Sequence, residues 1–292
     1  MSNPTPNTPV QPITVEIKRW IVAQAEVGVD PDTVLKAMLD SGWHEDVAML
    51  AMEQSLQEHL QTQKAQALPN QLVAAVGPDI DSRRHPSSIW AHDREVQILL
   101  ALQHPRIVLL GGLLSHEECD EMKALASVRL ARSETVENRS GGNEVHEART
   151  SHGMFFQRAE NELCHRVERR IASLVGWPLE NGEGLQVLRY SPGAQYKPHY
   201  DYFDVAAPGT ASILARGGQR VGTIVIYLNT VPGGGGTVFP ELQMEVSPIK
   251  GNAVFFAYPQ PHPSSGSLHG GSPVLEGEKW VATKWLREGV FA

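Results

Sequence analysis

Apolar residues recur at helical spacing near the start of the chain. The first set consists of Ile13, Ile17, Trp20, Ile21 and Ala25. Side chains spaced three and four residues apart lie on one face of an α-helix, so this set predicts a first amphipathic helix. Pro31, with Asp30 and Asp32 as candidate caps, predicts the start of a second helix, and a third is expected after Gly42. We therefore expect a three-helix module over residues 13–64.

The spacing changes after Gly184, where short apolar or alternating runs are separated by glycine and proline. The runs are LQVLRY, RVGTIVIYLNTV, GTVFP, MEVSP, NAVFFAY and KWVATKWL. Short strands with frequent turn signals predict a β-sandwich or barrel. Upstream, PRIVLLGGLLSHEECDEMKALASVRLA predicts a strand, a turn and an amphipathic helix that begins with a capping box of Ser115 and Glu118. We expect a mainly β domain with supporting helices over residues 91–292.

Polar segments separate these parts. Residues 1–12 are rich in Pro, Asn and Thr and predict a disordered tail. Residues 65–90 mix Pro, Gly, Ser and charges and predict a linker. The Gly-rich run VPGGGG at 231–236 lacks the lysine and helix that follow a phosphate loop, so we interpret it as a hairpin or bulge next to a site.

Composition and charge narrow the class of protein. The chain has 292 residues and a net charge of −8 with a pI near 5.8, which argues against a nucleic-acid partner. No apolar run is long enough to predict a membrane span. The two cysteines, Cys119 and Cys164, are too few for a disulfide framework. We expect a soluble cytoplasmic protein.

The stretch YKPHYDYF contains His199 and Asp201, two candidate metal ligands one residue apart. The same His-x-carboxylate spacing occurs at His44 and His116. The first of these lies on a predicted helix, where residues two apart are about 200° around the axis, and the second lies in the predicted capping box. His199 and Asp201 instead fall in an extended segment, where residues two apart point to the same side of a strand. They are therefore the better candidates.

A ferrous site of two histidines and one carboxylate keeps coordination positions open for a co-substrate and oxygen. The second histidine would be His262, between two prolines, or His269, in SLHGG; we prefer His269 because its glycines allow close approach. Ten residues later, Lys279 offers a cation for the far carboxylate of a metal-chelating acid. The competing Lys284 is five positions on and so faces the opposite side of the same strand.

Residues 185–287 resemble the catalytic core of the prolyl 4-hydroxylases, a branch of the 2-oxoglutarate- and Fe(II)-dependent dioxygenases. The motifs are LQVLRYSPGAQYKPHYDYF, GGQRVGTIVIYLNTV, GGGGTVFPE, VSPIKGNAVFFAY and SLHGGSPVLEGEKWVATKWLRE. Weaker similarity extends upstream, and the resemblance is to a bacterial type with an N-terminal helical extension. It implies a double-stranded β-helix, or jelly roll, as the catalytic core.

The resemblance also implies roles for individual residues. His199, Asp201 and His269 correspond to the iron ligands, and Lys279 to the residue that binds the C5 carboxylate of 2-oxoglutarate. Tyr190 and Thr237 match positions lining the co-substrate pocket, Tyr227 is a further pocket candidate, and Arg220 matches a position near the substrate. Trp280 is expected near the site because it is adjacent to Lys279 in the sequence. The implied reaction consumes 2-oxoglutarate and O2, with ascorbate as reductant, and hydroxylates a prolyl residue of a peptide or protein. Residues 132–151 match the region that closes over a peptide.

Other functions remain open. The enzyme class also contains members that act on a free amino acid, a small metabolite or a damaged nucleobase, and a jelly roll can serve as a non-catalytic binding protein. The helical module resembles ubiquitin-associated modules, with a Gly-Trp turn at 42–43 before its last helix. Two interpretations are open for this module: it only packs, or it binds a partner or forms a dimer.

Overall fold

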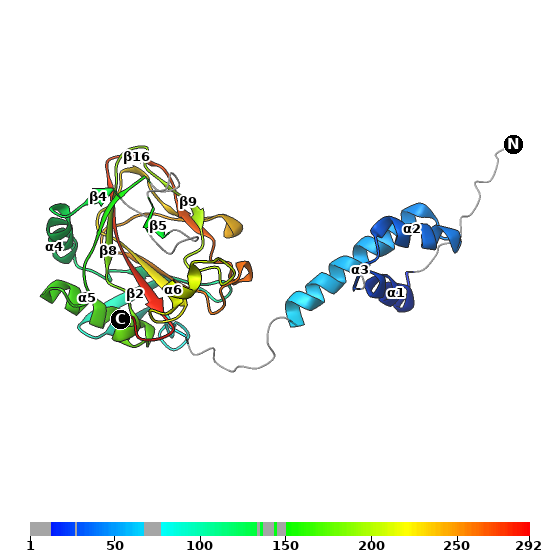
Figure 1. Cartoon of the computed structure of the whole chain (residues 1–292), viewed down its shortest axis with the longest axis horizontal. Helices are drawn as coiled ribbons and strands as arrows, with labels where there is room; N and C mark the ends of the chain where they lie inside the picture. Colours follow the sequence, from blue (N-terminus) through cyan, green and yellow to red (C-terminus); the bar gives the residue numbers. More distant parts are fainter. Residues whose placement is uncertain (1–12, 27, 67–76, 133–134, 137–142, 145–149) are drawn as a thin grey trace. The chain divides into compact units, whose positions relative to one another are not determined.

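The structure is a computed structural model that describes residues 13–26, 28–66, 77–132, 135–136, 143–144 and 150–292 (Figure 1). The chain forms two units, residues 1–73 and 74–292. The predicted tail 1–12 lies outside the described residues, as does most of the segment 132–151. None of the helices in the described ranges combines the length and apolar character that a membrane span requires.

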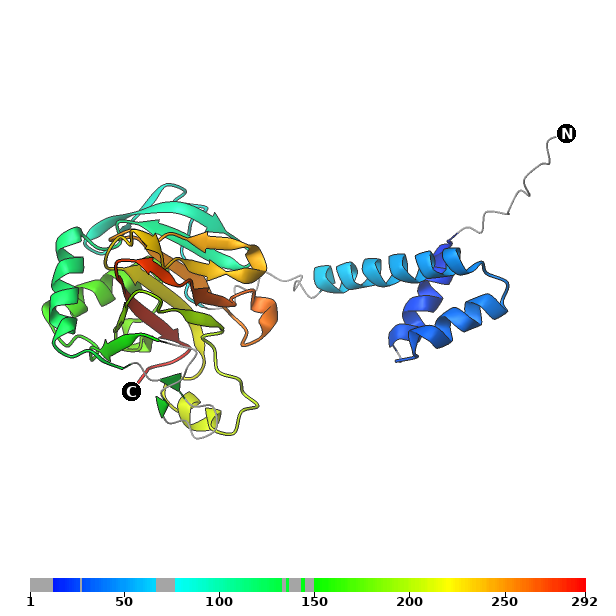
Figure 2. The same ribbon diagram turned by 90° about the horizontal axis from the view of Figure 1, so that it is seen from above.

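The N-terminal unit contains the three predicted helices, α1 (Val15–Glu26), α2 (Pro31–Asp40) and α3 (Glu45–Gln66). The helix α3 packs against both α1 and α2. Asp30 occupies the N-cap position of α2, with Pro31 in the first turn, but its side chain makes no capping hydrogen bond. A small core holds the unit together, with Ile21, Met38, Ala48 and Ala51 buried. Figure 2 shows the three helices from above.

The C-terminal unit is mainly β. Its first strands are β1 (Ser88–Ala91), β2 (Arg94–Leu102), β3 (Arg106–Gly111), β4 (Ala131–Arg132), β5 (Thr135–Val136), β6 (Asn143–Glu144), β7 (His152–Phe155), β8 (Gln186–Tyr190) and β9 (Tyr196–His199). The others are β10 (Arg220–Tyr227), β11 (Gly233–Gly234), β12 (Thr237–Phe239), β13 (Met244–Val246), β14 (Ala253–Ala257), β15 (His269–Gly271), β16 (Val274–Glu276) and β17 (Lys279–Arg287). The helices are α4 (His116–Ser127), α5 (Glu162–Val175) and α6 (Thr210–Leu214), with single 3₁₀ turns at Leu179–Asn181, Pro240–Leu242 and Pro263–Ser265.

Two antiparallel sheets carry the fold. Within the described residues the larger has nine strands in the order β1-β2-β3-β14-β10-β17-β8-β7-β4, and the smaller has the order β13-β12-β15-β9. Strands distant in sequence are neighbours in both sheets, as when β10 pairs with β14 and β17. This is the predicted double-stranded β-helix, and every strand named in the sequence prediction is present.

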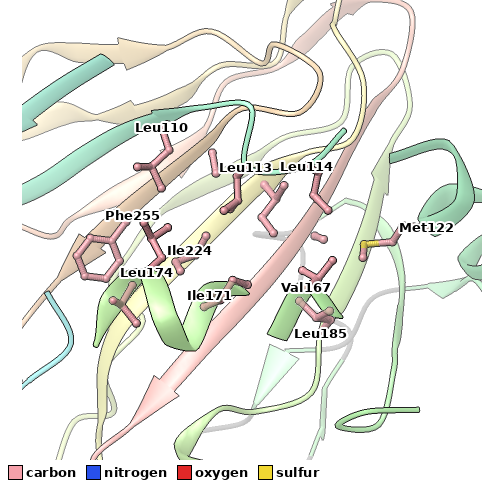
Figure 3. Close-up of a cluster of buried hydrophobic side chains, with 14 of the residues drawn as sticks. Leu110, Leu113, Leu114, Met122, Val167, Ile171, Leu174, Leu185, Ile224 and Phe255 are labelled. Atoms are coloured by element: carbon pink, nitrogen blue, oxygen red, sulfur yellow. The ribbon is translucent and has the colours of Figure 1, made fainter. Parts of the chain in front are cut away.

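Helices α4 and α5 cover one face of the larger sheet (Figure 1). Figure 3 shows the core beneath them, where Met122, Val167 and Ile171 from the helices meet Ile224 and Phe255 from the strands. The predicted capping box starts α4: the Ser115 hydroxyl accepts from the backbone N–H of Glu118, whose carboxylate accepts from the N–H of Ser115. One face of the sheet is thus sealed by helices, which leaves the other face for a site.

The opposite face of the larger sheet packs against the smaller sheet. The buried residues there are Ile107, Leu188, Tyr190, Ala194, Tyr227, Val231, Phe239, Val246, Val254, Phe256, Tyr258, Val274 and Val281. Neighbouring residues of one strand belong to different cores: Phe255 lies on the helix side and Phe256 between the sheets. This alternation follows from the two-residue repeat of a strand, and it explains why the central runs are apolar throughout.

The structure describes two parts of the segment predicted as a linker, residues 65–66 and 77–90. Helix α3 continues to Gln66, and from residue 77 onward the chain packs on the C-terminal unit. Ile80 is fully buried in the helix-side core, and Arg106 donates to the Asp79 carboxylate at 2.6 Å. A single apolar residue among prolines and charges has no periodicity, so local pattern alone did not indicate that this segment is anchored.

Candidate metal centre and adjoining pocket

Three side chains that can bind a metal converge between the sheets, where β9 and β15 are neighbours. His199 ends β9, and His269, the first residue of β15, is its direct partner in the antiparallel pairing. Asp201 follows shortly after, and one ligand atom from each of the three lies within 4.8 Å of the others. The Nε2 atom of each histidine is 3.5 Å from an oxygen of the Asp201 carboxylate. The fold therefore brings the three predicted ligands together.

The Asp201 side chain is not oriented by the strand alternation that the sequence predicted. Strand β9 ends at His199, so Asp201 lies in a bend beyond the strand, and strand alternation does not orient it. Its buried carboxylate is instead held from β10, where the Thr223 hydroxyl donates to Oδ2 at 2.7 Å. A contact between residues distant in sequence thus sets the direction of this side chain.

Backbone carbonyls orient both imidazole rings. Nδ1 of His199 is 2.9 Å from the carbonyl of Lys197, and Nδ1 of His269 is 2.9 Å from the carbonyl of Ser267. A carbonyl can only accept, so each Nδ1 carries the hydrogen and each Nε2 presents its lone pair to the Asp201 side. The ring of Tyr196 stacks on His199 at 3.7 Å and fixes it further.

The charge states of the cluster suit a divalent metal. Burial lowers the pKa of His269 to about 4, so the ring is neutral at pH 7. Burial would raise the pKa of Asp201, but His269 and His199 outweigh that effect and hold the pKa well below its usual range. Two imidazole nitrogens and one ionised carboxylate are the donor set that binds non-haem ferrous iron and leaves other positions open. The residues present therefore fit the metal that the sequence predicts.

The competing histidine lies elsewhere. His262 is exposed, and its Nδ1 accepts from the N–H of Ser264 at the start of a 3₁₀ turn. The glycine argument for His269 agrees with the structure, because a Cβ on Gly270 would lie 2.9 Å from the carbonyl oxygen of Tyr196. Glycine at this position allows β15 to lie against β9 and so places His269 opposite His199.

A cavity of about 450 Å³, part of it open to solvent, adjoins the three ligands. Alternate residues of β17 line it, namely Lys279, Val281, Thr283 and Trp285. Lys279 is 5% exposed, and burial lowers its pKa to about 8. Its Nζ donates to the carbonyl of Gly236 at 3.5 Å, and no carboxylate among the described residues forms an ion pair with it. A buried ammonium without a carboxylate partner is costly, which indicates an anionic ligand.

The other predicted pocket residues surround this lysine. Tyr190 and Thr237 line the cavity, and the Nζ of Lys279 is 5.6 Å from the centre of the Tyr190 ring. Tyr227 lies behind Thr237 and donates its hydroxyl hydrogen to Thr237 Oγ1 at 2.8 Å. Burial raises the pKa of Tyr227, so it stays a neutral hydrogen-bond donor. Tyr227 is therefore a support for the pocket wall.

The run VPGGGG lies next to this wall. The sequence predicted a hairpin or bulge beside a site for these residues. Gly233 and Gly234 form β11, which pairs with β16 through a register shift. Gly235 has a φ of +69°, and a Cβ there would lie 3.4 Å from Cδ of Lys279. The glycines thus shape the strand around the lysine side chain.

Of the two residues expected near the substrate, Arg220 lies beside the cavity and Trp280 lies on the other face of the sheet. Trp280 is adjacent to Lys279 on β17 and therefore points to the opposite face, where its Nε1 donates to Glu278. Arg220 lies beside the cavity, but Glu183 accepts from it at 2.6 and 2.9 Å, and its Nη1 is 3.4 Å from the carbonyl of Asp201. Trp280 is adjacent to Lys279 in the sequence, but its side chain packs against the helix-side core and does not line the cavity. Arg220 mainly holds the segment that carries Asp201.

Trp285 and Thr283 are lining residues that the sequence analysis missed. Strand alternation starting from Lys279 would have found both, because positions 281, 283 and 285 share its face. The Nε1 of Trp285 is buried and has no hydrogen-bond partner in the described structure. The guanidinium of Arg220 lies 3.9 Å from the centre of this indole ring. No comparable local signal indicates Tyr196, which lines the cavity from β9.

Known proteins share this site region. Residues 185–287 match the family model described as the 2OG-Fe(II) oxygenase superfamily. Prolyl 4-hydroxylase 2 of Arabidopsis thaliana is 37% identical over 229 residues, covering 70% of this chain and 74% of that protein. Prolyl 4-hydroxylase 1 of the same plant is 40% identical over 228 residues, covering 69% and 78%. The 2OG complex of a viral collagen prolyl hydroxylase from Paramecium Bursaria Chlorella virus-1 has 29% identity and a TM-score of 0.49, covering 62% of this chain and 95% of that chain.

Proposed function

The chain belongs to the prolyl 4-hydroxylase family of 2-oxoglutarate- and Fe(II)-dependent oxygenases, and we propose that it hydroxylates prolyl residues of a peptide or protein at the 4-position. One observation carries the proposal: a cluster of two histidines and one aspartate adjoins a cavity that contains a buried ammonium without a carboxylate partner among the described residues. A jelly roll that only bound a ligand would need neither feature.

The overall reaction balances as 2-oxoglutarate, O2 and a prolyl C–H bond giving succinate, CO2 and a prolyl C–OH. His199, Asp201 and His269 would hold the iron, whose chemistry when bound is the activation of dioxygen. The two oriented Nε2 lone pairs and the ionised Asp201 carboxylate are ready for this task without rearrangement of the rings. The chain's own residues bind, orient and exclude water.

Lys279 is proposed to bind the distal carboxylate of 2-oxoglutarate. Its ammonium lies between Tyr190 and the segment that carries Gly236, in a part of the cavity with little access for water. A charge-assisted hydrogen bond in such a place contributes more than one at the surface. Thr237, supported by the Tyr227 hydroxyl, is placed to donate or accept beside it.

Trp285 and Arg220 are proposed to border the prolyl residue. Trp285 lines the cavity, and the guanidinium of Arg220 stacks on its ring, so the two form a planar wall. Glu183 keeps Arg220 in place, and Arg287 also donates to Glu183 at 2.7 Å. A rigid aromatic wall suits the flat face of a pyrrolidine ring.

A single assay tests the function. The protein is incubated with Fe(II), ascorbate, 2-oxoglutarate and a proline-rich peptide, and succinate and the peptide mass are measured. We expect succinate together with a gain of one oxygen atom on proline. Succinate without peptide modification would indicate a free amino acid or small metabolite as substrate, and neither product would indicate a non-catalytic protein.

Two variants place the site. Asp201→Ala is expected to lose iron, because one of three ligands and the only carboxylate of the cluster disappears. Lys279→Ala should keep iron and require more 2-oxoglutarate. Wild-type behaviour of both variants would show that the site is elsewhere.

The finer aspects of the assignment are also proposals. We propose that the helical unit is an extension of bacterial type that binds a partner or a second copy, supported by the exposed side chains of Trp20, Met49 and Leu50. Light scattering of the full chain before and after Met49→Glu tests the second copy. A reducing compartment such as the cytoplasm is supported by Cys119 and Cys164, which are free and buried.

A further inference from the structure

Asp201 is the one member of the metal cluster that no regular element places. His199 and His269 sit on paired strands, whereas Asp201 lies in a bend after β9. Its carboxylate has two oxygens that can bind a metal. Each oxygen lies 3.5 Å from a ligand Nε2, Oδ1 from that of His199 and Oδ2 from that of His269, but Oδ2 also accepts a hydrogen bond from the Thr223 hydroxyl at 2.7 Å. The two oxygens therefore have different surroundings.

A second hydroxyl determines the direction of that hydrogen bond. The Tyr258 hydroxyl lies 2.8 Å from Thr223 Oγ1, and both residues are buried. A threonine hydroxyl has one hydrogen, and the Asp201 carboxylate can only accept, so that hydrogen points to Asp201. Tyr258 must then donate to Thr223. Hydrogen bonds in such a chain strengthen one another, so the hydroxyl of Tyr258 reinforces the bond to Oδ2.

We propose that Thr223 and Tyr258 are positioning residues. The Thr223 hydroxyl, reinforced by that of Tyr258, occupies Oδ2, so that Asp201 presents Oδ1 to the metal as a single ligand atom. The inference rests on the metal site of the proposed function. A carboxylate that bound through both oxygens would take one of the positions that 2-oxoglutarate and O2 need. The pair thus protects the open coordination positions from the protein's own ligand.

The backbone around Asp201 is held by a separate set of contacts. The side-chain amide of Gln219 accepts from the N–H of Phe203 and donates to its carbonyl, both at 2.8 Å. Arg220 contacts the carbonyl of Asp201 itself. Removal of the hydroxyl pair should therefore release the carboxylate without releasing the segment, and the two effects can be measured apart.

The experiment uses cobalt as a probe of the metal site in the absence of 2-oxoglutarate. Thr223→Val keeps the shape of the side chain and removes the hydroxyl, Thr223→Ser restores the hydroxyl, and Tyr258→Phe removes only the second donor. Loss of an outer hydrogen bond to a metal ligand weakens metal binding about 10- to 100-fold. We expect a loss of cobalt affinity in that range for Thr223→Val and a smaller loss for Tyr258→Phe. Thr223→Ser should recover the cobalt affinity of the wild-type protein. The visible absorption of bound cobalt should change in Thr223→Val, because it reports coordination number.

A matched control separates positioning from stability. Thr210 is another buried threonine, nine residues after Asp201 in the sequence, and its hydroxyl donates to the carbonyl of Asp204 at 2.6 Å. Thr210→Val should lower the unfolding temperature to a similar degree and leave cobalt binding unchanged. If Thr223→Val does not fold, Tyr258→Phe, which keeps its ring, carries the test.

Each outcome decides one question. Wild-type cobalt affinity and absorption in both Thr223→Val and Tyr258→Phe would overturn the inference, as would a Thr223→Ser variant that behaves like Thr223→Val. Weaker cobalt binding in Thr223→Val together with no prolyl hydroxylation by the wild-type protein would support the inference and reject the proposed function. Hydroxylation by the wild-type protein with unchanged cobalt binding in the variants would support the proposed function and reject the inference.

Discussion

The two faces of β17 each bury a lysine, and the two lysines have opposite surroundings. Lys284 faces α5, where its Nζ donates to the Glu168 carboxylate at 2.7 Å and to the carbonyl of Glu183. Lys279 faces the cavity between the sheets, where its Nζ donates to the carbonyl of Gly236 at 3.5 Å and lies 5.6 Å from the centre of the Tyr190 ring. Glu245 favours the charge of Lys279 from beyond ion-pair distance. Lys284 and Lys279 are 2% and 5% exposed, so burial does not distinguish them.

The difference illustrates two roles of a buried ammonium, one in the scaffold and one in ligand binding. A paired ammonium such as Lys284 belongs to the scaffold, because its partner satisfies it in every folded molecule. An ammonium that lines a cavity without a carboxylate at ion-pair distance gains a direct counter-charge when an anion enters. Strand alternation separates the two roles across one backbone, which allows the scaffold and the binding site to be altered independently.

The largest effect is expected on the scaffold face. Lys284→Met leaves the Glu168 carboxylate buried and unpaired, and breaking such a pair costs about 3–5 kcal/mol. We expect the free energy of unfolding in urea to fall by that amount. The double variant Lys284→Met/Glu168→Gln should recover most of the loss, because the uncompensated charge is gone. A small loss in the single variant would mean that the pair is not structural.

The cavity face should respond in the opposite way. Lys279→Met removes a charge-assisted bond worth about 1.5–3 kcal/mol, which corresponds to a roughly 10- to 150-fold weaker affinity for 2-oxoglutarate. Calorimetry under argon with manganese in place of iron measures this affinity. The unfolding free energy of the ligand-free variant should stay the same or rise, since a costly buried ammonium is lost. Destabilisation as large as that of Lys284→Met would contradict the comparison.

A pH series sharpens the role of Lys279. Its pKa is lowered to about 8 by burial, so the ammonium is mostly present at pH 7 and mostly lost at pH 9. A deprotonated lysine cannot attract a carboxylate, so the affinity of the free enzyme for 2-oxoglutarate should be nearly full at pH 7 and below, and should fall about tenfold from pH 7 to pH 9. Lys279→Arg should remove this dependence because guanidinium keeps its charge. A flat wild-type profile would argue against an ammonium at the binding site.

The smallest effect concerns the two tryptophans of the same strand. Trp285 lines the cavity and Trp280 lies on the other face. Trp285→Phe should raise the KM for the peptide about three- to tenfold, the range of aromatic contacts, without changing the affinity for 2-oxoglutarate. Trp280→Phe should change either value less than about twofold. Equal effects of the two substitutions on peptide KM would show that the face of β17 on which a tryptophan lies does not determine whether it contacts the substrate.

Much of this organisation could be predicted from local pattern. The three N-terminal helices, the strands after Gly184, the capping box at Ser115 and the opposite faces of Lys279 and Lys284 all follow from periodicity or from spacing of a few residues. Strand periodicity would also have placed Trp285 on the cavity face, although adjacency to Lys279 in the sequence led to the choice of Trp280 as the residue near the substrate. The anchoring of residues 77–90 had no such signal.

The chain's own residues determined which chemistry is available, because side-chain type is a local property: two imidazoles, one carboxylate and one ammonium. The two-residue repeat of β17 also determined that Lys279 and Lys284 face opposite sides. Tertiary structure alone decided how they meet. His269 became the partner of His199 through the register of β15 against β9, and Asp201 was oriented by Thr223 from a strand 22 residues further on. Such contacts depend on how sheets pack and on which buried polar groups must satisfy one another, and no local spacing contains that information.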